Sequence, residues 1–329
     1  MPRLRRVSVS SPGYGRRRAG RGWVFLDVDG TRLTDEEELA RCHRLAVPPA
    51  WRDVWICRYP NGHIQAFGYD DAGRGQYIYH EAWTERRKRR KHDHVLDVGR
   101  RLPVARRRVA RDLELPGMPR ERLLALAFRL LDLAYFRAGG EIYAKKNNSY
   151  GLATIRKDHV RVRRDGSVHF RYPAKSGQVR DVLVDDPVVA ELVTTLKRRR
   201  GGVDLLAWRE TGPDGRARWR DVTSADVQDY VKQQLGEDAT PKDFRTWHAT
   251  VLAARALADV GAPPASARKR RTIVADIVRD VAEELGNTPA VARASYVDPR
   301  LWDLWERGET IGSTRSTARA EREVLDLLG

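Results

Sequence analysis

The stretch Asp53–His80, DVWICRYPNGHIQAFGYDDAGRGQYIYH, contains short runs of strand-forming residues separated by turn-forming ones. Asn61-Gly62 separates the first two runs, and DDAGRG at 70–75 separates the second from the third. Both separators favour β-hairpins, whose strands are antiparallel. Upstream, GWVFLDV at 22–28 reads as a further strand and DEEELARCHRL at 35–45 as a short helix. The sequence therefore predicts a small antiparallel β domain.

The string VFLDVDGT, which begins at Val24, suggests a different fold. Its D-x-D-G-T pattern resembles the nucleophile loop of haloacid-dehalogenase-like phosphatases, in which Asp27 and Asp29 would form the catalytic pair. That fold requires alternating βαβ units, with the loop at the carboxyl end of a parallel strand. Here the string lies in a β-meander, and Asp29-Gly30 falls where a hairpin turn belongs. We therefore interpret the two aspartates as strand and turn residues.

The charge of the chain indicates its class of partner. The formal net charge is +17, and it is clustered. Residues 1–22 hold seven Arg and no acid, which predicts a basic mobile arm, and residues 84–111 hold twelve Lys or Arg against three acids. Such clustering favours a polyanion, with nucleic acid ahead of a membrane surface. Cys42 and Cys57 have no metal-ligand spacing and suit a reducing cytoplasm.

The remainder of the chain reads as mainly helical. RERLLALAFRLLDLAYF at 120–136 is apolar nearly all round, which is typical of a buried helix. Residues 159–184 alternate with period two between turn signals, which predicts a three-stranded meander. A capping residue followed by Pro predicts three further helix starts, at Asp186-Pro187, Thr240-Pro241 and Thr288-Pro289. The expected class is α+β.

Several polar residues stand beside these structural breaks. Arg137 ends the buried helix, and Lys175 occupies a hairpin tip in PAKSG. Arg245 opens a helix in KDFRTWHAT, while Asn287 and Tyr296 lie in LGNTPAVARASYVDPR. Each has an ordinary explanation: a helix-terminal cation, a turn lysine, an ion-pair partner, a helix end and a core aromatic. Their combination carries more information than any one of them.

Together and in this order, these residues resemble those of the type IB DNA topoisomerases, bacterial and poxviral branch. The strings at 242–250 and 285–300 are the most specific, and the resemblance covers nearly the whole chain. It implies a tyrosine recombinase/type IB topoisomerase-like fold. The expected domains are an N-terminal DNA-clamping β domain at 1–90, which includes the arm, and a mainly α catalytic domain at 91–329 with the β-meander.

The resemblance implies the chemistry. Tyr296 would attack the scissile phosphodiester, form a 3′-phosphotyrosyl bond and release a 5′-hydroxyl. Arg137 and Arg245 would stabilise charge on the phosphate, since guanidinium groups fork onto two oxygens. Lys175 would protonate the leaving oxygen. Asn287 would donate a hydrogen bond, where poxviral and eukaryotic members have His, so a proton-shuttling role is not expected there.

Other site residues are assigned on weaker sequence signals. Lys242 of KDFR matches a further family lysine, which assists the proton relay or holds a phosphate. Gln76, Tyr77 and Tyr79 resemble DNA-contact positions of the N-terminal domain, and Tyr143 resembles another. For the tyrosines, an ordinary half-exposed aromatic face is an equal alternative. His248, not counted among these, faces either the site or the core.

The resemblance implies that no cofactor is needed, because the family uses neither ATP nor metal. His92 and His94 are interpreted as solvated, since two His at i and i+2 of a basic helix cannot both face one ion. The expected partner is double-stranded DNA, with no membrane and no small-molecule cofactor. The protein is expected to be a monomer in the cytoplasm, associated with the nucleoid.

Two rival functions stay open at this point. A tyrosine recombinase uses the same nucleophile and two arginines, but it carries H-x-x-R where this chain has KDFR, and it usually begins with a helical domain. A non-enzymatic architectural DNA-binding protein with the same fold would not need Arg137, Lys175, Arg245 and Tyr296 together. Both comparisons favour a topoisomerase that relaxes supercoiled DNA.

Overall fold

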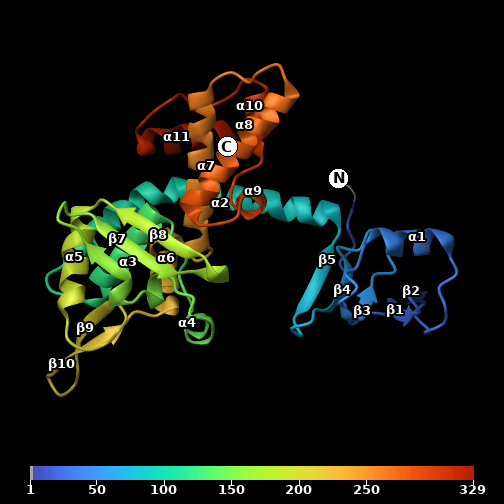
Figure 1. Ribbon diagram of the computed structural model, residues 1–329, viewed down its shortest axis with the longest axis horizontal. Coiled ribbons are helices and arrows are strands. Elements are labelled where there is room, and N and C mark those ends of the chain that lie inside the picture. The colour runs from blue at the N-terminus through green and yellow to red at the C-terminus, as the bar shows by residue number, and fades with distance from the viewer. Residues whose placement is uncertain (1–2) are drawn as a thin grey trace. The chain divides into compact units, whose positions relative to one another are not determined.

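The computed structural model describes residues 3–329, apart from the side chains of Tyr143 and Ser176. The chain divides after Lys91 into two compact units. Most helices and strands of both are labelled in Figure 1. Within the described residues, none of the helices is both long and apolar enough to cross a membrane.

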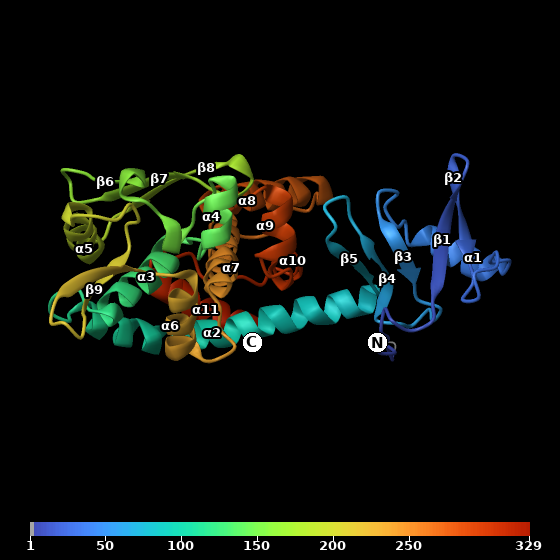
Figure 2. The same cartoon turned by 90° about the horizontal axis from the view of Figure 1, so that it is seen from below.

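The first unit is built on an antiparallel sheet with strand order β2-β1-β3-β4-β5 (Figure 2). Its elements are β1 (Tyr14–Ala19), β2 (Gly22–Leu26), α1 (Glu36–Arg44), β3 (Arg52–Ile56), β4 (Ile64–Tyr69) and β5 (Gly75–Tyr79). Its core consists of Phe25, Leu33, Cys42, Val47, Ile56 and Ala66. The three hairpin strands and the short helix predicted from the sequence are confirmed.

Two sequence-based interpretations are decided in this unit. Asp29 accepts hydrogen bonds from Thr31, and Gly30 has a φ of 84°, so this segment is a turn and not a catalytic loop. The predicted mobile arm at 1–22 is wrong for Tyr14–Ala19, which form β1. This strand pairs with β2 and β3. The backbone hydrogen bonds of that pairing, together with the packing of Tyr14 against the core, stabilise the strand despite its many arginines.

The second unit is mainly helical. Its helices are α2 (Glu81–Leu113, which begins in the first unit), α3 (Arg120–Ala134), α4 (Glu141–Asn147), α5 (Pro187–Arg198), α6 (Ser224–Leu235), α7 (Pro241–Val260), α8 (Ala267–Leu285), α9 (Pro289–Ser295), α10 (Arg300–Glu306) and α11 (Thr317–Leu328). Short 3-10 turns are η1 (Leu152–Thr154), η2 (Lys157–His159) and η3 (Lys175–Gly177). The helix starts predicted at Pro187, Pro241 and Pro289 are confirmed.

Two small antiparallel sheets accompany these helices. The predicted meander is confirmed as β6 (Val160–Val162), β7 (Val168–Pro173) and β8 (Val179–Val184), in that spatial order. The hairpin of β9 (Ala207–Thr211) and β10 (Ala217–Asp221) was not predicted. Its sequence, AWRETGPDGRARWRD, holds few apolar residues, so the period-two pattern is weak. The predicted α+β class is confirmed.

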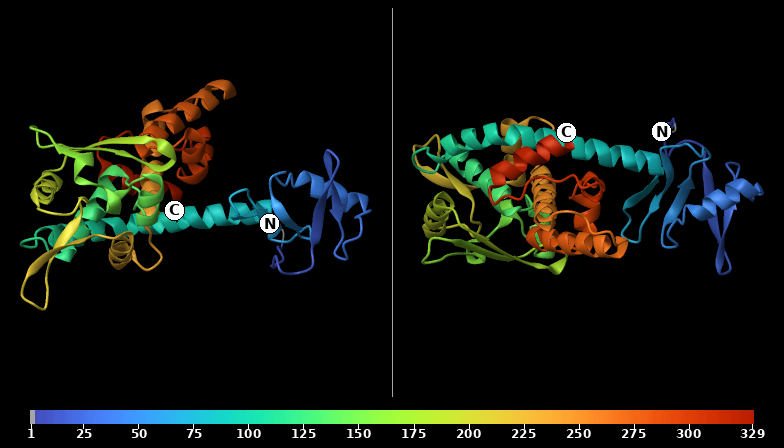
Figure 3. Two further views of the ribbon diagram at one scale, coloured as in Figure 1. Left: turned by 60° about the horizontal axis from the view of Figure 1, so that its bottom comes forward. Right: turned by 90° about the horizontal axis from the view of Figure 1, so that it is seen from above.

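A buried polar network links four helices of the second unit, α2, α3, α7 and α11. Figure 3 shows two further views of the ribbon of the chain that contains these helices. Arg106 of α2 donates from Nε to Asp132 of α3 at 2.7 Å and from Nη1 to Glu321 of α11 at 2.6 Å. His248 Nε2 lies 2.9 Å from the same aspartate, and Trp247 Nε1 donates to Glu321 at 3.2 Å. His248 is therefore a core residue. The network also orders α11, whose packing the sequence left open.

The two histidines expected to be solvated are not. His92 is 4% exposed, with Nδ1 3.9 Å from an Asp298 carboxylate oxygen. His94 lies between Asp238 and Asp243, at 3.1 and 3.2 Å. The prediction is wrong because α2 packs against the rest of its unit, a tertiary contact that the local basic sequence does not reveal.

The network yields a stability prediction. Burial raises the pKa of Asp132, but hydrogen bonds from His248 and Arg106 outweigh it and leave the pKa well below its usual range. Asp132→Asn should lower the free energy of unfolding by about 3–5 kcal/mol, because a buried ion partner is lost. Urea unfolding at pH 7 measures this loss. The depressed pKa means that the stabilisation is present above about pH 4 and fades as pH falls further.

Asp181→Asn is the matched control. Its carboxylate pairs with His169 at 2.7 Å, but the side chain is 60% exposed, so the loss should stay below about 1 kcal/mol. Equal losses in the two variants would contradict a special role for the buried network.

Candidate active site

A cavity of about 180 Å³ in the second unit brings most of the predicted catalytic residues together. It is lined by Arg137, Lys175, Gln178, Gly286, Asn287, Thr288, Val291 and Tyr296. Two further residues of the prediction lie beside it. The guanidinium carbon of Arg245 is 5.1 Å from the centroid of the Tyr296 ring, and Lys242 Nζ is 5.7 Å from it. Residues from four separate segments thus surround one phenol.

Tyr296 is held by contacts on both sides of its backbone. It follows α9, and its N–H donates to Ala292 O at 3.0 Å. Thr250 of α7 donates from Oγ1 to Tyr296 O at 3.4 Å and accepts from Asp298 N at 3.2 Å. The side chain is 8% exposed. Backbone hydrogen bonds just before and just after the Tyr296 side chain therefore fix the position of its phenol.

Arg245 lies in the first turn of α7 and is 2% exposed. Nη1 donates to Tyr135 O, and Nη2 donates to Leu285 O at 2.8 Å. Tyr135 ends α3 in the left-handed region, with φ of 57°. Burial lowers the pKa of Arg245 to about 10, so the group remains charged at neutral pH. Arg245 does not pair with the nearby Asp243, because that carboxylate caps α7 and contacts His94.

Arg137 and Asn287 form a pair. Arg137 Nη2 donates to Asn287 Oδ1 at 2.5 Å and to Gly286 O at 3.1 Å. With its oxygen occupied, the Asn287 amide has Nδ2 left to donate. Nδ2 is buried without a hydrogen-bond partner in the described part of the chain, as is Arg245 Nε. Unsatisfied buried donors are costly, so this cavity is suited to a ligand rich in acceptor oxygens.

The electrostatics of the cavity favour an ionised phenol. Burial raises the pKa of Tyr296, but the charge of Arg245, followed by those of Lys242 and Arg137, outweighs burial and leaves the pKa below its usual value. A phenol beside such cations is a better nucleophile at neutral pH than a free tyrosine.

Lys175 lies on η3, between β7 and β8, where Ala174 N donates to Gln178 O at 2.7 Å and closes the hairpin. The lysine side chain is exposed, and within the described residues it forms no hydrogen bond or ion pair. Lys242 is exposed as well. A long cationic side chain at a hairpin tip can reach a ligand in the adjoining cavity.

The DNA-contact residues predicted in the first unit share strand β5 but not one face. Tyr77 and Tyr79 stack with centroids 5.7 Å apart, and Phe67 packs on Tyr77. Gln76 points the other way along the strand and donates to Asp70 at 2.9 Å. Tyr143 lies in α4, but its side chain is outside the described residues.

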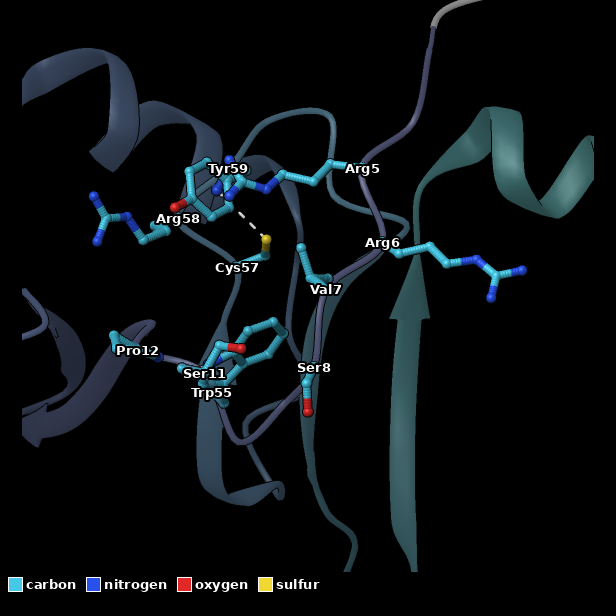
Figure 4. A pocket seen from close by; sticks show the side chains of 10 residues that line it. All are labelled: Arg5, Arg6, Val7, Ser8, Ser11, Pro12, Trp55, Cys57, Arg58 and Tyr59. Carbon is cyan, nitrogen blue, oxygen red and sulfur yellow. Dashed lines mark hydrogen bonds between the residues drawn. The ribbon is translucent and has the colours of Figure 1, made fainter.

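A larger cavity, of about 570 Å³, lies in the first unit (Figure 4). Arg5 extends over the Tyr59 ring at 3.7 Å, and the guanidinium carbon of Arg58 lies 5.2 Å from the centroid of the same ring, whereas Arg6 points away from it in Figure 4. Cys57 also lines it, but burial raises the pKa of this thiol. None of the predicted catalytic residues lies here, so size alone does not identify the reactive site.

Sequence reasoning missed two residues that organise the cavity. Thr250, five positions after Arg245, ends the string at 242–250 and donates to Tyr296 O, and Arg180 of β8 donates to carbonyls at the end of α8. The chain has 62 Lys and Arg residues, so an arginine in a strand carries no distinguishing signal.

Comparisons with known proteins agree with this arrangement. Residues 22–70 match the model of the bacterial DNA topoisomerase IB N-terminal domain. Residues 80–313, more than half of the chain, match that of the eukaryotic DNA topoisomerase I catalytic core. The chain is 29% identical over 297 residues to a DNA topoisomerase 1B of Acanthamoeba polyphaga mimivirus, a match that covers 89% of this chain and 88% of the viral protein. With both regions matched in order along the chain, the chain belongs to the type IB DNA topoisomerases.

Proposed function

We propose that this topoisomerase cleaves one DNA strand with Tyr296. The phenolic oxygen bonds to phosphorus, the bond from phosphorus to the 5′ oxygen breaks, and the phenolic proton passes to solvent. The 3′-phosphotyrosyl bond conserves the energy of the broken bond, so resealing by the 5′-hydroxyl needs no ATP. Between the two steps the free strand end turns about the intact strand and relaxes supercoils.

Arg137, Arg245 and Asn287 are proposed to bind the nonbridging phosphate oxygens. The observation that carries this proposal is the pair of unpartnered buried donors, Arg245 Nε and Asn287 Nδ2, beside Tyr296. A pentacovalent phosphate in the cavity would present acceptor oxygens to both. Fixed donors of this kind stabilise charge that develops in the transition state.

Lys175 is proposed as the general acid that gives its proton to the departing 5′ oxygen. An alkoxide is a poor leaving group, and the exposed ammonium beside the cavity can deliver a proton to it. Lys242, near the Tyr296 ring, is proposed to hold a phosphate or assist the proton transfer. These roles use protein cations throughout, and we infer that neither a metal nor another cofactor is required.

DNA contact outside the cavity is assigned to the first unit and to α2. Tyr77 and Tyr79 present a stacked aromatic face, and residues 84–91 of α2 carry six Lys or Arg. We propose that these groups bind duplex DNA, with Gln76 and Tyr143 as further contacts, and that one chain acts as a monomer at the nucleoid.

The nucleophile is tested with Tyr296→Phe on supercoiled plasmid, without ATP and with EDTA. The wild type should yield a ladder of relaxed topoisomers and, on a denaturing gel, a protein–DNA adduct. The variant should yield neither, but it should keep its affinity for DNA, since only one oxygen is removed. An adduct in the variant would assign the nucleophile to another residue, while strand exchange by the wild type would favour recombination.

The general acid is tested with Lys175→Ala. Cleavage of ordinary DNA should slow by about 10²–10⁴-fold if proton donation is lost. A substrate with sulfur in place of the bridging 5′ oxygen releases a thiolate, which needs no proton because thiol pKa values lie near 8.5. The variant should cleave it almost as fast as the wild type does. Equal impairment on both substrates would transfer the role, with Lys242 the next candidate.

Asn287 is tested by two substitutions. Asn287→Ala should slow cleavage by about 10²–10³-fold, the typical effect of one lost donor at a developing anion, without weakening DNA binding. Asn287→His should remain active, because imidazole can also donate. Rapid single-turnover cleavage by the Ala variant would reduce Asn287 to a residue that ends α8.

A further inference from the structure

The C-terminal end of α8 gathers an unusual number of arginines. The last carbonyl groups of a helix lack intrahelical partners. Here Asn287 N donates to Ala282 O at 2.8 Å. Gly286 adopts a left-handed φ of 61° and ends the helix. The carbonyls from Glu283 to Gly286 accept from guanidinium groups on three other segments of the unit.

The three arginines divide these carbonyls between them. Arg245 donates to Leu285 O and Arg137 to Gly286 O, and both belong to the proposed catalytic set. Arg180 of β8 takes the two preceding carbonyls, donating to Glu283 O at 3.2 Å and to Glu284 O. It is 9% exposed and does not line the cavity around Tyr296. Arg180 therefore contacts the end of α8 and not the cavity around Tyr296.

Arg180 also packs closely against the residue that turns the chain. A methyl group at Gly286 would lie 2.8 Å from Arg180 Cδ, so the two residues are in direct contact. The next residue is Asn287, whose amide is paired with Arg137. The position of Arg180 thus bears on both proposed phosphate-binding groups through one turn of backbone.

We propose that Arg180 is a positioning residue for DNA cleavage. Its guanidinium fixes the end of α8, so that the turn at Gly286 and Asn287 presents the amide and Arg137 to the scissile phosphate. By occupying two carbonyls itself, it leaves the remaining donors of Arg137 and Arg245 for the ligand. This inference rests on the proposed roles of Arg137 and Asn287.

Charge and hydrogen-bond geometry together explain why a guanidinium suits position 180. Three like charges repel, and the partial negative charge at the helix C-terminus offsets that repulsion. A guanidinium is planar and donates to both carbonyls at once, whereas an ammonium is a point charge with a different geometry. Arg180→Lys should therefore keep the charge but lose the two-point support of the turn.

The test measures single-turnover cleavage and DNA affinity separately. Arg180→Gln and Arg180→Lys should each slow cleavage, the former by about 10²-fold, as for a misplacement of about 1 Å, with the dissociation constant for DNA nearly unchanged. Arg199→Gln is the matched control. That residue is 8% exposed and also donates to carbonyls, those of Gly201 and Asp204, but in the loop after α5. Arg199→Gln should change the stability of the fold about as much as Arg180→Gln does, but it should cleave DNA at the wild-type rate.

Double variants distinguish positioning from a general loss of structure. If Arg180 acts through the turn, then adding Asn287→Ala to Arg180→Lys should slow cleavage less than the product of the two single effects. Adding Lys175→Ala should multiply the effects. Cleavage at the wild-type rate by the Lys variant, or multiplication in both pairs, would overturn the inference. Failure of the proposed function would look different, because Asn287→Ala alone would then cleave normally.

Discussion

The carbonyl groups at the end of α8 allow three guanidinium groups to occupy one small region. Without that partial negative charge, Arg137, Arg180 and Arg245 would repel one another, and burial would add to the cost of each charge. The hydrogen bonds that hold them also fix their orientation. The same helix end leads directly into Asn287 and then, through α9, to Tyr296. The proposed nucleophile and the three arginines are therefore positioned around a single helix terminus.

The buried network around Asp132 also holds α7, the helix that carries Arg245. His248, which contacts Asp132, lies three residues after Arg245 on α7, and Thr250 on the same helix holds the backbone at Tyr296. Helix α7 is thus anchored to α3, and through Arg106 to α2 and α11. Asp132, His248 and Glu321 of this network are buried, and removal of one partner from a buried ion pair is strongly destabilising. Burial of the network keeps α7 in one orientation relative to the end of α8.

Local signals predicted much of this architecture. Caps followed by Pro located the starts of α5, α7 and α9, because that pair satisfies orphan donors and fixes φ whatever surrounds it. Alternating residues and hairpin turns predicted the meander and the first sheet in the same way. The local signal failed where tertiary packing dominates. Arg-rich β1 reads as a mobile arm until its partner strands are present, and His92 reads as solvated until α2 is packed.

For the site, the sequence alone determined which chemical groups are present and in which order. The phenol, the arginines, the lysines and the amide stand in recognisable strings, since their chemistry depends on residue type. Only the tertiary structure decided how they are held. Arg137 and Asn287 are 150 positions apart yet 2.5 Å apart as a hydrogen-bonded pair. Arg180 is proposed as their support, among 62 basic residues, because its guanidinium donates to the carbonyls of Glu283 and Glu284 at the end of α8. Such a partnership exists only after distant segments have packed, because no local pattern encodes where a helix end will lie.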